Sequence, residues 1–153
     1  MTVNERLTDL GITLPEPARP QGLYAPAIRT GHLVYVSGQL PTRDGTLIHT
    51  GKLGSDVSIE QGQECARQAV LNALAILKQE LGSLDFVFRV VRLTVLVASA
   101  EGFVAQPQVA NGASQLLLDV FGDQGRHTRV ASGAAELPLN APVEIDLIIE
   151  SAA

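Results

Sequence analysis

Polar and apolar residues alternate one by one in two short runs on either side of the turn RTGH, residues 29–32. In the second run the two alternating sets are Leu33, Tyr35 and Ser37 against Val34 and Val36. A period of two predicts an antiparallel β-hairpin. Residues 42–56 are rich in glycine and polar residues, so we predict a loop there with one short strand at 46–49.

Apolar residues recur at helical spacing from about Ile59 to Leu81, which predicts a long amphipathic helix. Ser58 precedes this segment and Gln61 follows three residues later, the pattern of a capping box. Gly82 comes directly after the last apolar residue and is typical of the end of a helix. The sequence therefore predicts both ends of this helix as well as its apolar face.

A second helix and a long strand are predicted in the following part of the chain. The helix should run from roughly Gln106 to Phe121, because Pro107 lies in its first turn and Gly122 just past its end. Between the two helices, the segment from Phe86 to about Ala98 is rich in β-branched residues, which favours one long central strand.

The last predicted elements are two strands within residues 126–150, joined by a proline-containing turn as a hairpin. The order β-β-α-β-α-β-β predicts an α+β fold, in which two helices cover one face of a mixed or mostly antiparallel sheet. Both faces of the central strand look apolar, since Val87, Val91, Leu93, Val95 and Val97 alternate with Phe86, Phe88, Val90 and Leu96. With no third helix predicted within the domain of residues 22–153, a second subunit is the simplest cover for the other face.

Residues 1–21 are predicted to be an N-terminal extension, with a short helix followed by ITLPEPARPQG. Three prolines in this stretch disfavour regular strand pairing. Residues 22–153 are predicted to form a single domain, because 153 residues with 46% hydrophobic content can close one core.

Charge and hydropathy narrow the class of partner. Sixteen acidic against eleven basic residues give a net charge of −5, which disfavours nucleic acid. The N-terminus lacks the apolar core of a signal peptide, and no apolar run is long enough to span a membrane. These features predict a cytoplasmic protein that binds neither nucleic acid nor a membrane.

Common catalytic motifs are absent from the sequence. It has no phosphate-binding glycine loop, no HExxH and no CxxC, and neither Ser-Gly pair lies in a GxSxG motif. The histidines His32, His49 and His127 have no ligand-like spacing, so we predict no metal and no cofactor. Cys65 lies in the long helix and is expected to be a small buried hydrophobic residue rather than a nucleophile.

Two charged residues in the last predicted hairpin are candidates for chemistry. Arg129 is followed by small and apolar residues, which leave room for a carboxylate ligand beside the guanidinium. The alternative is an exposed arginine in a surface ion pair. Glu144 is either on a solvated strand face or, if the hairpin forms, in one pocket with Arg129, where it could orient a water or exchange a proton.

These residues carry a resemblance that covers roughly residue 22 to the C-terminus. YVSGQLP after the first hairpin, then Arg129, Leu137-Pro138 and Glu144 within VEID, is similar to the RidA/YjgF-type reactive intermediate deaminase family, formerly the endoribonuclease L-PSP family. The resemblance implies a chorismate-mutase-like fold. It also implies a homotrimer, in which the sheets form a central barrel and clefts between subunits hold the active sites.

The resemblance implies hydrolysis of 2-imino acids or their enamine tautomers to 2-keto acids and ammonia, without metal or cofactor. Arg129 matches the arginine that holds the substrate carboxylate, and Glu144 matches the acidic residue near the attacking water. The further substrate-binding residues implied by the resemblance are Tyr24, Ser37, Gly38 and Asn111.

The residues around Arg129 depart from the pattern of many active relatives. His127 and Thr128 replace Pro-Ala before the arginine, and Val130 and Ala131 replace Ser and Cys after it. Loss of these polar atoms motivates an alternative, a protein that binds small carboxylates such as keto acids in the same cleft without turnover. The acidic balance disfavours the ribonuclease activity of the older family label.

Overall fold

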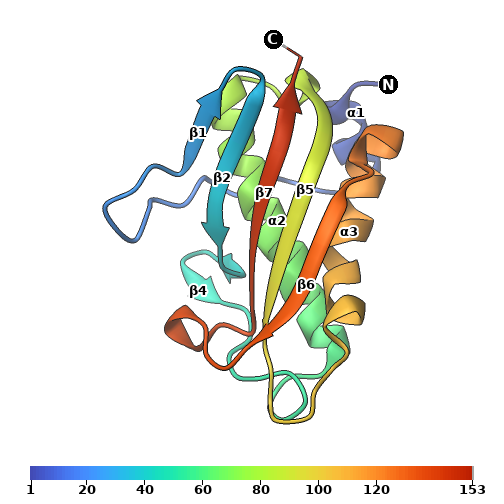
Figure 1. The fold of residues 1–153 in the computed structure, drawn as a ribbon. Coiled ribbons are helices and arrows are strands. Elements are labelled where there is room, and N and C mark those ends of the chain that lie inside the picture. Colours follow the sequence, from blue (N-terminus) through green and yellow to red (C-terminus); the bar gives the residue numbers. More distant parts are fainter. Residues whose placement is uncertain (153) are drawn as a thin grey trace.

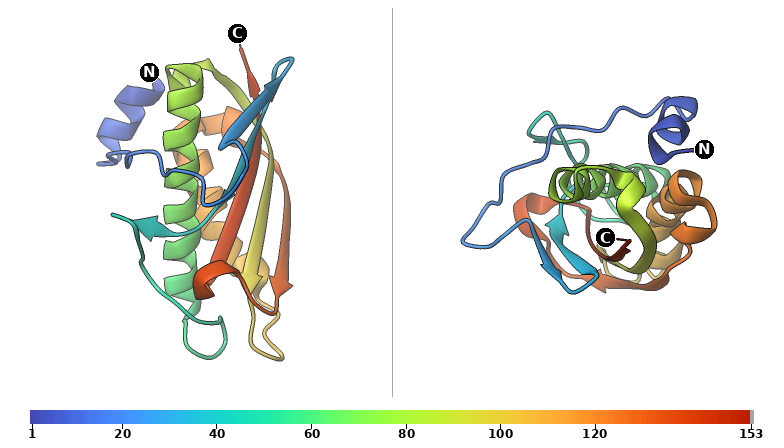
Figure 2. Two further views of the ribbon diagram at one scale, coloured as in Figure 1. Left: turned by 90° about the vertical axis from the view of Figure 1, so that its left-hand side faces the viewer. Right: turned by 90° about the horizontal axis from the view of Figure 1, so that it is seen from above.

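The computed structural model describes residues 1–152, which form one five-stranded sheet with helices on one of its faces (Figures 1 and 2). The order of strands is β1-β2-β7-β5-β6, with only β5 and β6 parallel. Their bounds are β1 Ala27–Thr30, β2 Leu33–Gln39, β5 Val87–Ala98, β6 Thr128–Ala134 and β7 Val143–Ser151. The predicted α+β fold with a mixed sheet is confirmed, as is the hairpin of β1 and β2.

Helix α2 (Ile59–Leu81) begins and ends where the sequence predicts. Ser58 Oγ accepts a hydrogen bond from the backbone N–H of Gln61 at 3.1 Å, and Gln61 Oε1 accepts one from the backbone N–H of Ser58 at 3.0 Å. At the other end Gly82 has φ of 84°, the left-handed conformation that stops a helix and that glycine adopts without strain. The capping box therefore fixes the start of α2, and Gly82 fixes its end.

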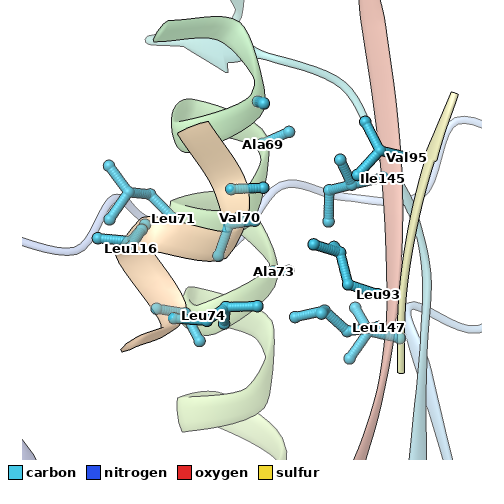
Figure 3. Close-up of a cluster of buried hydrophobic side chains, with 14 of the residues drawn as sticks. Ala69, Val70, Leu71, Ala73, Leu74, Leu93, Val95, Leu116, Ile145 and Leu147 are labelled. Carbon is cyan, nitrogen blue, oxygen red and sulfur yellow. The ribbon is translucent and has the colours of Figure 1, made fainter. Parts of the chain in front are cut away.

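The core lies between α2, α3 (Gln106–Phe121) and the sheet (Figure 3). Figure 3 shows Leu93 of β5 and Leu147 of β7 on the side of the sheet that faces α2, and both are at most 1% exposed, as are Val70 and Leu74 of α2. Burying each such side chain contributes about 1.5–3 kcal/mol. This core holds β5 and β7 in the middle of the sheet.

Helices α2 and α3 cross in close contact. A Cβ atom on Gly112 of α3 would overlap the backbone carbonyl of Gln63 in α2. The Gln63 side chain in turn donates a hydrogen bond to the carbonyl of Gln108 at 2.9 Å. The absence of a side chain at Gly112 is what lets the two helix backbones approach so closely.

We expect Gly112→Ala to lower the free energy of unfolding by about 1–3 kcal/mol, because overpacking outweighs the gain of about 1 kcal/mol in helix propensity. Urea denaturation measures the change. Gln115→Ala is the matched control on the exposed side of α3 and should change stability by about 0.5 kcal/mol or less. A Gly112→Ala protein at least as stable as the wild type would contradict the close helix contact.

The last two strands do not form the predicted hairpin, and that prediction is wrong. Strand β6 pairs in parallel with β5, whereas β7 lies between β2 and β5 and is antiparallel to both. The reason is the connection through α3, since a helical crossover joins parallel neighbours. Strand β7 has buried residues at every second position and takes the central place. The connecting loop contains Leu139 and Asn140, both with positive φ.

Strand β5 also departs from the predicted alternation. Register shifts against β7 fall between Val87 and Arg89 and between Val90 and Arg92. As a result Val90 is buried with Leu93, whereas Val91 is only half-buried. Among residues 1–152, no helix covers the face opposite α2 and α3 (Figure 2). That face presents a partly exposed apolar set, Ile28, Tyr35, Leu96, Val130 and Ile148.

Short elements complete the fold. Helix α1 (Val3–Asp9) packs on the domain, with Leu7 only 5% exposed and the Val3 backbone N–H donating to Asp85 Oδ1 at 2.7 Å. The small ribbon β3 (Thr42–Arg43) and β4 (Thr46–Leu47) lies in the segment predicted to be mostly loop. Three 3-10 turns are η1 Leu84–Phe86, η2 Gly122–Gly125 and η3 Pro138–Asn140. None of the helices within residues 1–152 is long and apolar enough to cross a membrane.

Cys65 is fully buried in α2, as expected, and burial raises the pKa of its thiol to about 12. In the unfolded state the thiol ionises near pH 9, whereas in the folded state it keeps its proton well above this pH. The contribution of the thiol to stability is therefore lost as the pH rises above 9. We expect the stability advantage of wild type over Cys65→Ala to shrink by about 1.4 kcal/mol per pH unit between pH 9 and 10.5. Urea denaturation of both proteins at each pH measures this. An unchanged difference would contradict the burial of the thiol.

Candidate functional site

The predicted site residues fall into two groups in the structure. Arg129 and Asn111 lie together where the edge strand β6 meets α3. Tyr24, Gly38 and Glu144 line one cavity near the ends of β2 and β7. Within one chain these groups do not form a single pocket.

Arg129 is half-buried and projects to the helix side of the sheet. It lies opposite Leu93 in the β5–β6 register, and its Nη1 donates to Asn111 Oδ1 at 2.8 Å and to Ser114 Oγ at 3.2 Å. Both acceptors are neutral. Within residues 1–152 no carboxylate lies within 4.0 Å of the guanidinium, and its Nε and Nη2 donate to no protein atom. The surface ion pair that was the alternative to carboxylate binding is thus not formed within residues 1–152.

Ser114 was not predicted as a site residue. It lies three residues after Asn111 on α3, so both side chains occupy one helix face, and this spacing is the signal that could have identified it. His127 also contacts Ser114, with 2.9 Å between Nε2 and Oγ. The other ring nitrogen, Nδ1, lies 2.6 Å from the carbonyl oxygen of Gly125. Sequence reasoning rejected His127 as a metal ligand and otherwise treated it as a departure from the relatives' pattern.

Glu144 is half-buried in a cavity of about 810 Å³. The N-terminal segment, the β3–β4 ribbon and the η3 turn all contribute to its walls, with Arg19, Asp44 and Leu139 among the lining residues. A Cβ atom on Gly38 would collide with the carboxylate of Glu144, so the absence of a side chain there leaves room for this group. The prediction that residues 1–21 form a separate extension stays a prediction, although part of that segment faces the candidate site.

The environment of Glu144 favours its protonated form. Burial raises the pKa of the Glu144 carboxyl above its ordinary value, and the negative charge of Asp146 raises it further. Asp146 lies two residues along β7 on the same face, and burial raises its pKa too. Neighbouring carboxyls in a partly desolvated site can hold and release a proton nearer to neutral pH than free carboxyls do.

The other predicted pocket residues hold local structure. The hydroxyl of Ser37 donates to the carbonyl of Ala25 at 2.6 Å. Tyr24 is 51% exposed, and its hydroxyl accepts from the backbone N–H of Gln21 at 3.3 Å. Ser37 thereby ties the segment that carries Tyr24 to β2, at the rim of the Glu144 cavity.

The predicted approach of Glu144 to Arg129 through a hairpin is wrong. Strand β5 lies between β6 and β7, with Arg129 opposite Leu93 and Glu144 opposite Leu96. Three residues along a strand span about 10 Å. The two side chains also point to opposite faces, because Arg129 contacts α3 whereas Glu144 alternates with the buried Val143. A reaction that needs both residues would need two copies of the chain.

The chain belongs to the family described as "YjgF/chorismate_mutase-like, putative endoribonuclease", whose model matches residues 4–151. Among curated proteins it is 44% identical to Protein TCP17 of Trypanosoma cruzi, over 97% of this chain and 93% of that protein. It is also 28% identical to a RutC family protein of Aquifex aeolicus, over 90% of this chain and 95% of that protein.

Two solved structures resemble the whole chain. One is a protein of unknown function from Agrobacterium tumefaciens, 44% identical, with a TM-score of 0.91 over 99% of this chain and 93% of that one. The other, from Shewanella oneidensis, carries the same endoribonuclease description and is 36% identical, with a TM-score of 0.95 over 98% of this chain and 99% of that one. The predicted family and fold are therefore confirmed.

Proposed function

We propose that this protein is a hydrolytic deaminase that converts 2-imino acids, or their enamine tautomers, to 2-keto acids and ammonia. Water adds to the C=N carbon, the nitrogen takes up a proton, and the C–N bond breaks as the C=O bond forms. The reaction is a hydrolysis, so electrons balance without an oxidant or reductant. An iminium carbon is already electrophilic, which leaves the protein to bind the substrate and place the water.

The guanidinium of Arg129 is the observation that carries the proposal. Nη1 is fixed by two neutral acceptors, Asn111 and Ser114, while Nε and Nη2 donate to no atom of residues 1–152. These two nitrogens form one edge of the planar guanidinium, and such an edge binds the two oxygens of a carboxylate. An arginine held by neutral groups, with no acidic partner, is therefore suited to bind an anionic substrate.

Glu144 supplies the proton transfer in this proposal. A carboxyl whose pKa is raised by burial exchanges protons more readily near neutral pH than an exposed one. In its ionised form it accepts a proton from the attacking water. Tyr24 and Gly38, which line the same cavity, shape the space around the substrate.

Arg129 of one copy and Glu144 of another form the complete site in this proposal. The two residues lie on opposite faces of one sheet, and the face that carries Glu144 is not covered by any helix within residues 1–152. A homotrimer with its sheets packed as a barrel would cover the apolar residues of that face, among them Tyr35 and Ile148. It would also bring the edge strand β6 of one subunit toward a neighbour.

The test generates imino acids in place with an amino-acid oxidase and catalase, then follows keto-acid formation with and without the protein. Several amino-acid side chains should be compared, because Arg129 recognises only the carboxylate. We expect faster keto-acid release than spontaneous hydrolysis for at least one side chain. Sedimentation of the same sample should give three times the mass of the 16.2 kDa chain. No acceleration with any side chain would sink the deaminase proposal.

A binding protein for small carboxylates is the second candidate, and Val130 favours it. This residue follows Arg129 and is 42% exposed, and the resemblance implies a polar residue at this position in many active relatives. Binding of pyruvate that depends on Arg129, without imine hydrolysis, would select this candidate.

The ribonuclease label of the family is not favoured for this chain. Its net charge is −5, and RNA binding relies on basic surfaces and stacked aromatic residues, of which the chain has few. Incubation of the pure protein with RNA should leave the RNA intact.

A further inference from the structure

A series of hydrogen bonds joins His127, Ser114 and Arg129, and its donors and acceptors can be assigned. Nη1 of Arg129 can only donate, so Ser114 Oγ accepts the bond between them at 3.2 Å. The carbonyl of Gly125 can only accept, so His127 Nδ1 carries a proton and donates at 2.6 Å. The donor roles of Arg129 Nη1 and His127 Nδ1 are therefore assigned.

For a neutral His127, these assignments also determine the direction of the hydrogen bond between His127 and Ser114. A neutral imidazole protonated at Nδ1 has a free lone pair on Nε2. Ser114 Oγ lies 2.9 Å from this nitrogen and has one proton to donate. The serine hydroxyl therefore donates to His127 and turns its own lone pairs toward Arg129. In this arrangement Nη1 of Arg129, Nδ1 of His127 and the hydroxyl of Ser114 each have an acceptor, and Nε and Nη2 of Arg129 are left for a ligand.

We propose that His127 and Ser114 are positioning residues that orient the carboxylate-binding edge of Arg129. This inference rests on the proposed role of Arg129 as the carboxylate anchor. Asn111 accepts one of the two Nη1 protons and Ser114 the other, so the plane of the guanidinium is fixed by two points. His127 acts through Ser114, because it keeps the hydroxyl proton away from the guanidinium. The departure of His127 from the relatives' pattern thus has a specific role in this chain.

The effect should fall on substrate binding rather than on the chemical step. The substrate carboxylate does not change during hydrolysis, so an anchor contributes equally to the ground state and to the transition state. A loosened anchor raises KM and leaves kcat nearly unchanged. A structural role of His127 would instead reduce stability and the amount of active protein.

The test compares His127→Asn with His127→Gln. An asparagine side chain can reach the carbonyl of Gly125 but offers no acceptor at the place of Nε2. A glutamine side chain is long enough to place its amide oxygen near that point and accept from Ser114. We expect His127→Asn and Ser114→Ala to raise KM about tenfold with kcat within about twofold, since both variants weaken or remove the hydrogen bond that Ser114 accepts from the charged guanidinium. His127→Gln should remain within about twofold of wild type in both constants.

Pyruvate binding, measured by calorimetry on the same variants, separates this inference from the proposed function. A pyruvate Kd that is tenfold higher for His127→Asn and close to the wild-type value for His127→Gln supports the inference even if the wild type hydrolyses no imine. Imine hydrolysis that requires Arg129 but is equal in His127→Asn and wild type would overturn the inference and leave the function standing. Equal losses in the Asn and Gln variants, with lowered melting temperatures, would show a structural role and overturn it too. Pyruvate binding unaffected by Arg129→Ala would overturn both proposals.

Discussion

Arg129→Ala is expected to lower kcat/KM for imine hydrolysis by about two orders of magnitude and to abolish measurable binding of pyruvate. A bidentate bond between a guanidinium and a carboxylate contributes about 1.5–3 kcal/mol in a site shielded from water, which corresponds to roughly 10–150-fold. Losing the fixed position of the substrate adds to this effect. Steady-state kinetics with oxidase-generated imino acids and calorimetry with pyruvate measure the two losses.

Arg129→Lys and Arg126→Ala are the controls for this prediction. Lysine keeps the positive charge but not the planar pair of donors, so Arg129→Lys should recover only a small part of the loss. Arg126 is exposed, and its replacement should leave kcat/KM within about twofold. Full activity in Arg129→Ala, or an equal loss in Arg126→Ala, would show that general positive charge matters rather than this one anchor.

Local sequence patterns predicted those elements of the fold whose boundaries depend on nearby residues. The bounds of α2 follow from Ser58, Gln61 and Gly82, all within one helical turn of the ends they determine. The β1–β2 hairpin likewise joins neighbours across a short turn. Such signals involve few residues and little loop closure, so they are visible in the sequence alone.

The pairing of β6 and β7 could not be predicted from local patterns, because it depends on the rest of the sheet. Both segments alternate as strands, and the short turn between them favoured a hairpin. In the structure the buried side of β7 packs against α2, while β6 follows the crossover of α3 to the edge of the sheet. Burial of Ile145 and Leu147 in the centre thus outweighs the proximity of the two strands in sequence.

The contacts within the candidate site could not be predicted from local patterns either. Arg129 and Glu144 could be selected as residues, but their relative position followed from the wrong strand pairing. Ser114 and His127 are separated by thirteen residues, and their contact depends on how α3 lies beside β6. Residues brought together by packing rather than by spacing are therefore the ones that the sequence does not reveal.

Glu144→Gln is expected to lower kcat by about 10²–10⁴-fold, the usual contribution of a general acid or base, while KM changes little. The ionised carboxylate is the form that accepts a proton, so wild-type activity should fall as pH is lowered through the pKa of Glu144. Burial raises this pKa, which places the fall at a higher pH than for an ordinary glutamate. The variant should have low activity without this pH dependence. Kinetics across pH 4–8 measure both effects.

Glu144→Gln should lose activity but gain stability relative to wild type as the pH rises. Because the folded-state pKa of Glu144 is raised, folding favours its protonated form, and that contribution is lost as pH rises through the pKa. Glutamine carries no charge at any pH. The stability of Glu144→Gln relative to wild type should therefore be greater at pH 8 than at pH 4, as measured by urea denaturation.

Asp146→Asn distinguishes Glu144 from its neighbour on the same face. The charge of Asp146 helps to raise the pKa of Glu144, so removing it should shift the acidic fall in activity to lower pH and leave the maximal kcat within a few-fold. If Asp146→Asn instead removes the activity while Glu144→Gln retains it, Asp146 is the proton acceptor. In that case the cavity that contains Glu144 would have to bind a part of the substrate remote from the reacting carbon.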